Sequence, residues 1–174
     1  MARQELPFPN SYWVIPGKFM AGEYPGSSDE RMHEHKVQRL LALHVDLVID
    51  LTDEGEGVPY LPLLMQEAQL LDRVVEHRRF PILDFFVPAA EEMVQILDVI
   101  DAALAANKIV YLHCMGGIGR TGTVVGCYLV RHGLRGDQAL ETLANLRREV
   151  PCWYQQSPET SAQRELVFNW PIGG

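Results

Sequence analysis

The sequence predicts an α/β fold, a three-layer sandwich in which helices flank a central, mostly parallel sheet of four to five strands. Two observations lead to this prediction. Residues 45–52 (VDLVIDLT) are β-branched and apolar almost throughout, as in a strand that is covered on both faces. Residues 91–106 repeat apolar side chains at i, i+3, i+4 and i+7, the spacing of a helix with one buried face. Segments of these two kinds alternate along the chain, which is the pattern of parallel strands joined by helices.

The first half of the chain begins with two short apolar runs around Pro16-Gly17, a dipeptide typical of a turn. A helical pattern with its apolar residues along one side follows. An acidic loop (DEGEG) separates the buried strand from a further short helix. The expected elements of this half are a hairpin at 13–26, helices at 29–43 and 63–72, and strands at 45–52 and 74–82.

In the second half, the segment LDFFVPAA at 83–90 interrupts regular structure before the clearest helix begins. Gly133 is a suitable residue to end the helix that follows the glycine-rich loop. Ser157 is the expected N-cap of the last helix, with Pro158 at its first position. The expected elements are helices at 91–106, 121–132, 137–149 and 158–170, and a buried strand at 108–113. No repeat or linker interrupts the series, so residues 1–174 are expected to form one domain.

The composition restricts the classes of partner and compartment. The chain has 174 residues, of which 47% are hydrophobic, and a formal net charge of -8. This charge argues against a nucleic-acid backbone or an anionic membrane surface as partner. No apolar run approaches the roughly 18 residues that span a bilayer, and no signal peptide is recognisable at the start. Three cysteines without a secretory signal indicate a reducing compartment, so a cytoplasmic protein is expected, with its oligomeric state left open.

The segment YLHCMGGIGRTG, residues 111–122, carries the strongest chemical signal. It places Cys114 at the end of a predicted buried strand, where ligands of α/β sheets bind. Three glycines among the next five residues allow successive backbone N–H groups to point into one cavity. The positive end of the following helix and the planar guanidinium of Arg120 both favour a phosphate. The segment therefore predicts a phosphate-binding loop.

A thiol at the base of this loop changes its predicted chemistry. The environment that holds a dianion also stabilises a thiolate, and lowers a cysteine pKa from about 8.5 into the range of roughly 3.5–7.5. A thiolate beneath a bound phosphate is placed for in-line attack on phosphorus. A small buried hydrophobe is the ordinary alternative for a lone cysteine at a strand end, but the glycines, Arg120 and the flanking elements all favour the nucleophile Cys114.

HCMGGIGRTG resembles the signature HC-x5-R-[ST]-G of the cysteine-based protein tyrosine phosphatase superfamily, and the chain as a whole resembles its small atypical dual-specificity phosphatases. WVIPGKFMAG, FPILDFFVP and VYLHCMGGIGRTGTVVGCYLV carry the likeness over most of the chain. The resemblance implies that Cys114 is the nucleophile, that Arg120 clamps the phosphoryl oxygens and that Thr121 hydrogen-bonds the sulfur. It also implies that His113 tunes the thiolate, although a core histidine stays open as an alternative. The substrate-binding residues are then Met115, Gly116, Gly117, Ile118, Gly119 and Arg120.

The resemblance also implies a general acid, because the leaving group needs a proton from a positioned side chain. The family takes it from an aspartate on a loop after a strand, and Asp84 in PILDFFVP matches, with a solvated loop aspartate as the alternative. Asp72 and Glu91 are the next candidates. Gln163 is a candidate to position the hydrolytic water, or else an ordinary glutamine on a helix surface.

Three acidic residues, Asp53, Glu54 and Glu56, follow a strand that ends near the predicted phosphate site. One of them is a candidate to pair with Arg120, although solvated loop acids are more common. Cys127 is most simply a packing residue, and the sequence leaves a redox role of Cys152 open.

The sequence predicts a phosphomonoesterase without a cofactor, since the histidines show no spacing suited to a shared metal. The expected partner is a phosphorylated protein or peptide, with phosphotyrosine favoured. A phosphatase for a small metabolite or phosphoinositide is the alternative, followed by a non-catalytic phosphate-binding module. Arsenate reductases and rhodaneses also use cysteine-headed anion loops, but Asp84 and the Arg-Thr-Gly ending favour phosphate-ester hydrolysis.

Overall fold

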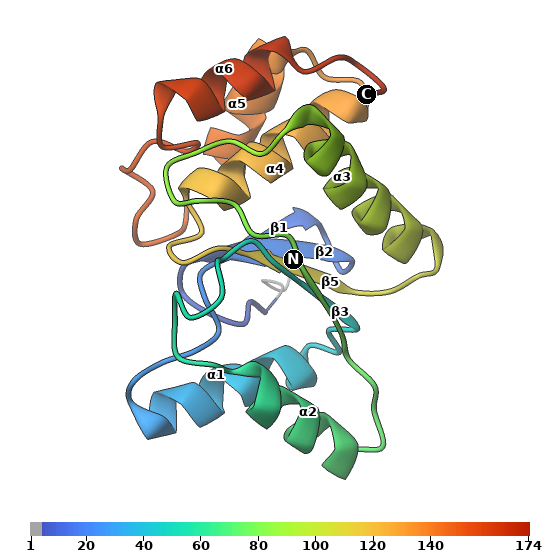
Figure 1. The fold of residues 1–174 in the computed structure, drawn as a ribbon, viewed down its shortest axis with the longest axis vertical. Coiled ribbons are helices and arrows are strands. Elements are labelled where there is room, and N and C mark those ends of the chain that lie inside the picture. The colour runs from blue at the N-terminus through green and yellow to red at the C-terminus, as the bar shows by residue number, and fades with distance from the viewer. Residues whose placement is uncertain (1–4) are drawn as a thin grey trace.

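A computed structural model describes residues 5–174 and confirms the three-layer α/β sandwich (Figure 1). A five-stranded sheet with the order β1-β2-β5-β3-β4 forms the middle layer. β1 pairs with β2 antiparallel, and the remaining pairs are parallel. In Figure 1, α1 and α2 cover one face of the sheet, and α3 to α6 cover the other. The strands are β1 (Ser11–Ile15), β2 (Phe19–Gly22), β3 (Leu47–Asp50), β4 (Glu76–Arg79) and β5 (Val110–His113).

The three central strands, β2, β3 and β5, are buried at every position. Because successive side chains point to opposite faces, each strand serves two cores. In β5, Val110 and Leu112 join the core beneath α3 to α6, whereas Tyr111 joins the core beneath α1 and α2. The nearly continuous apolar character of these strands is therefore the signature of a sheet covered on both faces.

The edge strand β4 is shorter than the predicted 74–82. It pairs with β3 over four positions only, from Glu76 to Arg79. Its sequence EHRR contains no apolar residue, because one side of an edge strand is open to solvent. Val74, which the prediction included, is 85% exposed.

The helices lie close to their predicted positions. Asp29 is the N-cap of α1, with Oδ1 accepting from the N–H of Met32 at 2.8 Å. The helices are α1 (Glu30–Ala42), α2 (Leu61–Leu70), α3 (Ala90–Ala105), α4 (Gly119–Arg131), α5 (Gly136–Leu146) and α6 (Ser161–Asn169).

The predicted start of the last helix was wrong. Thr160, not Ser157, is the N-cap of α6, and its Oγ1 accepts from the N–H of Gln163 at 3.2 Å. Gln163 returns a bond, with Oε1 accepting from the N–H of Thr160 at 3.0 Å, so the two form a capping box. Ser157 instead donates to the carbonyl of Ile118 at 2.6 Å. Its hydroxyl therefore ties the chain before α6 to the loop before α4.

α4 runs through the middle of its layer and positions the phosphate loop. It is buried at nearly every position, and α3, α5 and α6 pack around it. Gly126 allows the closest approach, because a Cβ atom there would lie 2.6 Å from the side chain of Val167 in α6. The N-terminus of α4 is thereby fixed just beyond the C-terminal end of β5, at the position that binds ligands in α/β folds.

Candidate active site

The phosphate loop lies where the sequence places it, between β5 and α4. Cys114 directly follows β5 and is 3% exposed. Gly117 has a φ of 70°, a left-handed conformation that favours glycine. A Cβ atom there would also lie 2.4 Å from the backbone carbon of Gly22, at the end of β2. The loop is therefore folded tightly against the neighbouring strand, with the thiol at its base.

Arg120, in the first turn of α4, is a buried cation with a 1% exposed side chain. Its Nη1 donates to Oε2 of Glu56 at 2.8 Å and to the carbonyl of Ile82 at 3.0 Å, and Nη2 binds the other carboxylate oxygen of Glu56. Nε is buried without a partner among the described residues. Glu56 thus occupies the end of the guanidinium and leaves the side formed by Nε and Nη2 for an oxyanion.

Glu56 is therefore the acid of the 53–57 loop that pairs with Arg120. The hydrogen bond from Arg120 lowers the pKa of Glu56, so the carboxylate stays charged. Burial alone would lower the pKa of Arg120, but the pair with Glu56 raises it. The N–H of Asp53 also donates to Glu56, at 3.0 Å, and fixes the carboxylate in the loop. The sequence predicted such a partner but did not select one residue.

Asp84 reaches the same guanidinium from the segment between β4 and α3. Its Oδ1 lies 3.2 Å from Nη2 of Arg120, and its side chain is 52% exposed. Oδ1 also accepts from the N–H of Phe85 at 3.1 Å, and Phe85 has a φ of 67°. The Asp84 carboxylate thus lies next to the Nε–Nη2 side of Arg120, the expected phosphate-binding side, and is half exposed to solvent.

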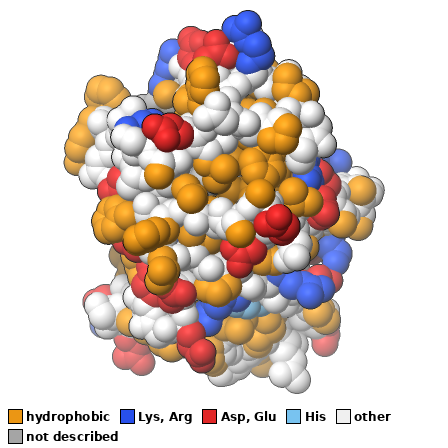
Figure 2. Space-filling model, turned by 45° about the horizontal axis from the view of Figure 1, so that its top comes forward, with side chains coloured by type: hydrophobic (Ala, Val, Ile, Leu, Met, Phe, Trp, Pro, Cys, Tyr) orange, Lys and Arg blue, Asp and Glu red, His pale blue; other side chains and the backbone are white. Residues whose placement is uncertain are grey.

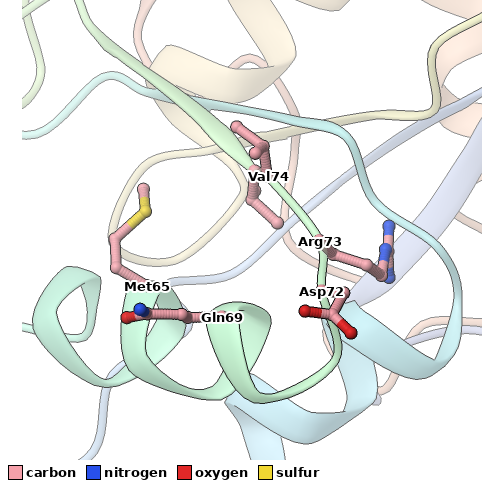
Figure 3. Close-up of a pocket in the computed structure, with 6 residues that line it drawn as sticks. Met65, Gln69, Asp72, Arg73 and Val74 are labelled. Carbon is pink, nitrogen blue, oxygen red and sulfur yellow. The ribbon is translucent and has the colours of Figure 1, made fainter.

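Asp72, a second candidate acid, lies elsewhere. It lines a shallow hollow of about 400 Å³ at the end of α2, together with Met65, Gln69, Arg73 and Val74 (Figure 3). This hollow precedes β4 and therefore lies at the N-terminal edge of the parallel strands, whereas Cys114 follows the C-terminal end of β5. Glu91, the third candidate, lies in the first turn of α3.

Thr121, in the first turn of α4, and His113, at the end of β5, are the two other residues that the resemblance assigns to the thiol. Thr121 is fully buried, and its Oγ1 has no partner among the described residues, which leaves it available to a thiolate. His113 is also fully buried, with Nδ1 3.1 Å from the carbonyl oxygen of Cys114 and Nε2 2.7 Å from the hydroxyl of Tyr60. Since a carbonyl only accepts, Nδ1 carries the proton and Nε2 accepts from Tyr60.

Comparison with known proteins agrees with this geometry. A model of the family described as "Swiss Army Knife protein, DSP-PTPase phosphatase domain" matches residues 9–168. The chain belongs to this family. It is thus a small atypical dual-specificity phosphatase-like member of the cysteine-dependent protein tyrosine phosphatase superfamily.

The individual relatives share 30% or less of their residues with this chain over the matched regions. The crystal structure of Tk-PTP in its active form superimposes with a TM-score of 0.72 at 27% identity, and the match covers 92% of this chain and 95% of that one. The phosphatidylglycerophosphate phosphatase PTPMT1 of Arabidopsis thaliana is 30% identical over 134 residues, which are 76% of this chain and 36% of that protein. The dual specificity protein phosphatase CDC14B of Mus musculus is 26% identical over 127 residues, 69% of this chain and 24% of that protein. The chain therefore spans well under half of these two curated relatives.

A buried charged network that the sequence did not predict lies behind the phosphatase loop. Asp50, at the end of β3, is fully buried and accepts from Thr52 at 2.6 Å and from Nη2 of Arg79 at 3.0 Å. Nε2 of His77 lies 3.4 Å from the same carboxylate, and Nε2 of His113 lies 3.9 Å from it. Burial alone would raise the pKa of Asp50, but its hydrogen bonds hold it well below the usual range. The only signal in the sequence is one carboxylate at the end of an apolar strand.

Gln163 is buried and hydrogen-bonded inside the protein, so it is not a surface residue. Its side chain is fully buried, and Oε1 accepts from the N–H groups of Glu159 at 3.1 Å and Thr160 at 3.0 Å. Nε2 donates to the carbonyl of Phe86 at 3.2 Å. Both lone pairs of the oxygen are therefore in use, and the role of Gln163 in orienting the hydrolytic water stays a prediction.

The other two cysteines lie apart from the loop in sequence. Cys127 is buried inside α4, where burial raises the pKa of its thiol, in agreement with a packing role. Cys152 is partly exposed, and its Sγ lies 3.5 Å from Nη2 of the buried Arg147.

No helix in the described part of the chain has both the length and the apolar character needed to cross a bilayer. Residues 5–174 also hold no group of three or more histidine, cysteine, aspartate or glutamate side chains able to bind a metal ion together.

Burial of His113 should make the stability of the phosphatase depend on pH. Burial lowers the pKa of His113 from 6.5 to about 4, so the unfolded chain binds a proton between these pH values that the folded protein does not. We expect the free energy of unfolding to fall as the pH decreases from 6.5 to 4, by about 3 kcal/mol from this group. In His113→Asn, whose amide can still donate to Cys114 but does not titrate, the fall should be smaller by that amount. Urea unfolding at several pH values measures it, and an unchanged pH dependence would contradict the assignment.

Proposed function

We propose that the protein hydrolyses phosphate monoesters through a phosphocysteine on Cys114, with phosphotyrosine in a protein or peptide as the favoured substrate. The observation that carries the proposal is the guanidinium of Arg120. Glu56 binds the Nη1–Nη2 end of the guanidinium, and Asp84 lies near Nη2. Nε has no partner among the described residues, and Arg120 follows directly after the loop that begins at Cys114. A phosphate on Nε and Nη2 would therefore lie between the nucleophile and the acid.

The reaction proceeds in two steps. The Cys114 thiolate attacks phosphorus, an S–P bond forms and the P–O bond to the leaving group breaks, while Asp84 gives its proton to the leaving oxygen. The backbone N–H groups of residues 115–119 and Arg120 stabilise the charge of the transferring phosphoryl group. Water then attacks phosphorus and gives a proton to the Asp84 carboxylate, which restores the acid; the S–P bond breaks and inorganic phosphate leaves. Thr121 Oγ1 stabilises the thiolate as leaving group. The positive end of α4 lowers the cost of the thiolate in both steps.

The surroundings of the loop support an aromatic phosphate. Leu83, Phe85 and Phe86 flank Asp84 and are each more than half exposed. Apolar side chains therefore lie beside the proposed phosphate-binding site. The intervening residues of the signature, MGGIG, carry no charge. On the face shown in Figure 2, hydrophobic side chains cover much of the middle, and basic side chains form no continuous area. A substrate with one phosphate and an apolar ring suits this charge distribution better than a polyanion.

A lipid or metabolite phosphatase is the second candidate. The observation in its favour is the likeness to the Arabidopsis phosphatase PTPMT1, whose printed activity is on phosphatidylglycerophosphate. The same cysteine chemistry would serve such a substrate. The uncharged loop and the acidic chain are the reasons to place it second.

Asp84→Asn should lower kcat/KM on a phosphotyrosine peptide by roughly 10²–10⁴-fold, because the leaving phenolate loses its proton donor. The loss should shrink for aryl phosphates whose leaving groups are stable anions, since these need less protonation. Steady-state kinetics with a series of aryl phosphates measures this, with Asp72→Asn as the matched control because Asp72 lies at the other edge of the sheet. An Asp84→Asn enzyme that keeps its rate on the peptide would show that another acid acts.

Phosphotyrosine peptides and aryl phosphates should give a higher kcat/KM than any phosphoinositide, with weaker activity on phosphoserine and phosphothreonine peptides. A parallel assay of these substrates with phosphatidylglycerophosphate and sugar phosphates, run with a chelator present, checks the order. Vanadate should inhibit, and the chelator should not. If a phospholipid is the best substrate by tenfold or more, the second candidate replaces the first.

A further inference from the structure

We propose that Gln163 is a positioning residue, which latches the segment that carries Asp84 onto the phosphate loop and so sets the place of the general acid. The inference rests on the proposed function, in which Asp84 is the proton donor. It assigns to the amide a part in the first chemical step, in place of the role in orienting water that the sequence suggested.

The amide of Gln163 joins three segments. Nε2 donates to the carbonyl of Phe86, two residues after Asp84, at 3.2 Å. Oε1 accepts from the N–H groups of Glu159 and Thr160, at the start of α6. A Cβ atom at Gly119 would lie 3.1 Å from Oε1 and 3.2 Å from Nε2, so the amide lies directly against the phosphate loop. Figure 1 shows the segment between β4 and α3 passing close to α4 and α6.

The segment held by this amide has little else to fix it. Ile82 and Pro88 are buried, but every residue from 83 to 87 is exposed, including the aromatic side chains of Phe85 and Phe86. Phe85 also has a positive φ, which is uncommon for a residue with a side chain and requires support from its surroundings. Hydrogen bonds must therefore determine the position of the segment, because packed side chains do not.

Only a few hydrogen bonds join the exposed part of the segment to the rest of the protein. Arg120 contacts Asp84 itself, and a bound phosphate would compete for that contact. Oγ1 of Thr160 donates to the carbonyl of Phe85 at 3.4 Å, a long bond. The bond from Gln163 is shorter, comes from a fully buried donor and is not used by the substrate. It is thus the contact that would persist through the reaction.

The position of Asp84 matters most when the leaving group needs a proton. A displacement of about 1 Å in a catalytic group can cost on the order of 10²-fold in rate. Loss of the Gln163–Phe86 bond should therefore lower kcat/KM, which reports the steps through formation of the phosphocysteine. The loss should appear only for poor leaving groups, because good ones need no proton from Asp84. A residue that orients water would affect kcat through hydrolysis of the phosphocysteine and would leave kcat/KM unchanged.

Two variants separate the two functions of Gln163, which are its bond to Phe86 and its capping of α6. Gln163→Glu keeps an oxygen for the N–H groups of Glu159 and Thr160 but loses the donor to Phe86. Gln163→Met removes both functions without adding a charge. Gln138→Glu is the matched control, because Gln138 has the same capping position in α5, with Oε1 accepting from the N–H of Arg135 at 3.1 Å. α5 begins beyond the C-terminal end of α4, away from the phosphate loop.

The test compares kcat/KM for a phosphotyrosine peptide and for p-nitrophenyl phosphate, which has a much better leaving group. We expect both Gln163 variants to lose roughly 10- to 100-fold on the peptide and less than threefold on p-nitrophenyl phosphate, with inhibition by vanadate unchanged. Gln138→Glu should match the wild type on both substrates. If Gln163→Met does not fold, as thermal unfolding would show, Gln163→Glu decides alone.

Three results would overturn the latch. These are an unchanged kcat/KM on the peptide, an equal loss on both substrates, and a burst of p-nitrophenol followed by slow turnover with kcat/KM intact. The last result would show that Gln163 orients the hydrolytic water. Failure of the proposed function itself looks different, because the wild type would then turn over neither substrate, or Asp84→Asn would show no dependence on the leaving group.

Discussion

Arg120 is a cation with almost no access to water, and much of the site follows from the need to keep it charged and oriented. Burying an unpaired guanidinium is costly, so the protein supplies a carboxylate for the side that the substrate does not use. Glu56 does this from the 53–57 loop, and the carbonyl of Ile82 takes a further donor. Nε is then left without a partner among the described residues, and a glycine-rich loop before a helix can point several backbone N–H groups at an anion. A phosphate would complete the set of partners that the protein leaves incomplete.

The guanidinium of Arg120 and the positive N-terminal end of α4 also favour the thiolate form of Cys114. The thiol lies at the base of the loop and below the N-terminus of α4, where a thiolate is stabilised. His113 adds a fixed dipole rather than a charge, because burial keeps its ring neutral at physiological pH while Nδ1 bonds to the Cys114 carbonyl. Asp50, which stays charged, lies behind that ring and is itself held by Arg79 and Thr52. The backbone beneath the nucleophile is thus supported from the core of the sheet.

The sequence was sufficient for the features that depend on local pattern. Strands with continuous apolar character, helices with one apolar side and the position of the loop between β5 and α4 were confirmed, because each depends on neighbours in the chain. The choice of Glu56 over its neighbours depends on how the 53–57 loop folds back onto α4, which no local pattern encodes. The start of α6 was misplaced because Ser157 and Thr160 are both good caps, and only a tertiary bond to Ile118 removes Ser157 from that role. The burial of Gln163 was not predicted for the same reason, since its partner Phe86 is 77 residues away in the sequence.

The central claim is that phosphate passes through Cys114, and trapping the intermediate tests it most directly. The wild-type enzyme would be mixed with a phosphotyrosine peptide in the presence of a chelator, quenched within the first turnover and digested for mass spectrometry. We expect one phosphoryl group on the peptide that contains Cys114, and none after the same treatment of Cys114→Ser, which should bind the substrate but not turn it over. A phosphoryl group on another residue, or turnover by Cys114→Ser near the wild-type rate, would contradict the account.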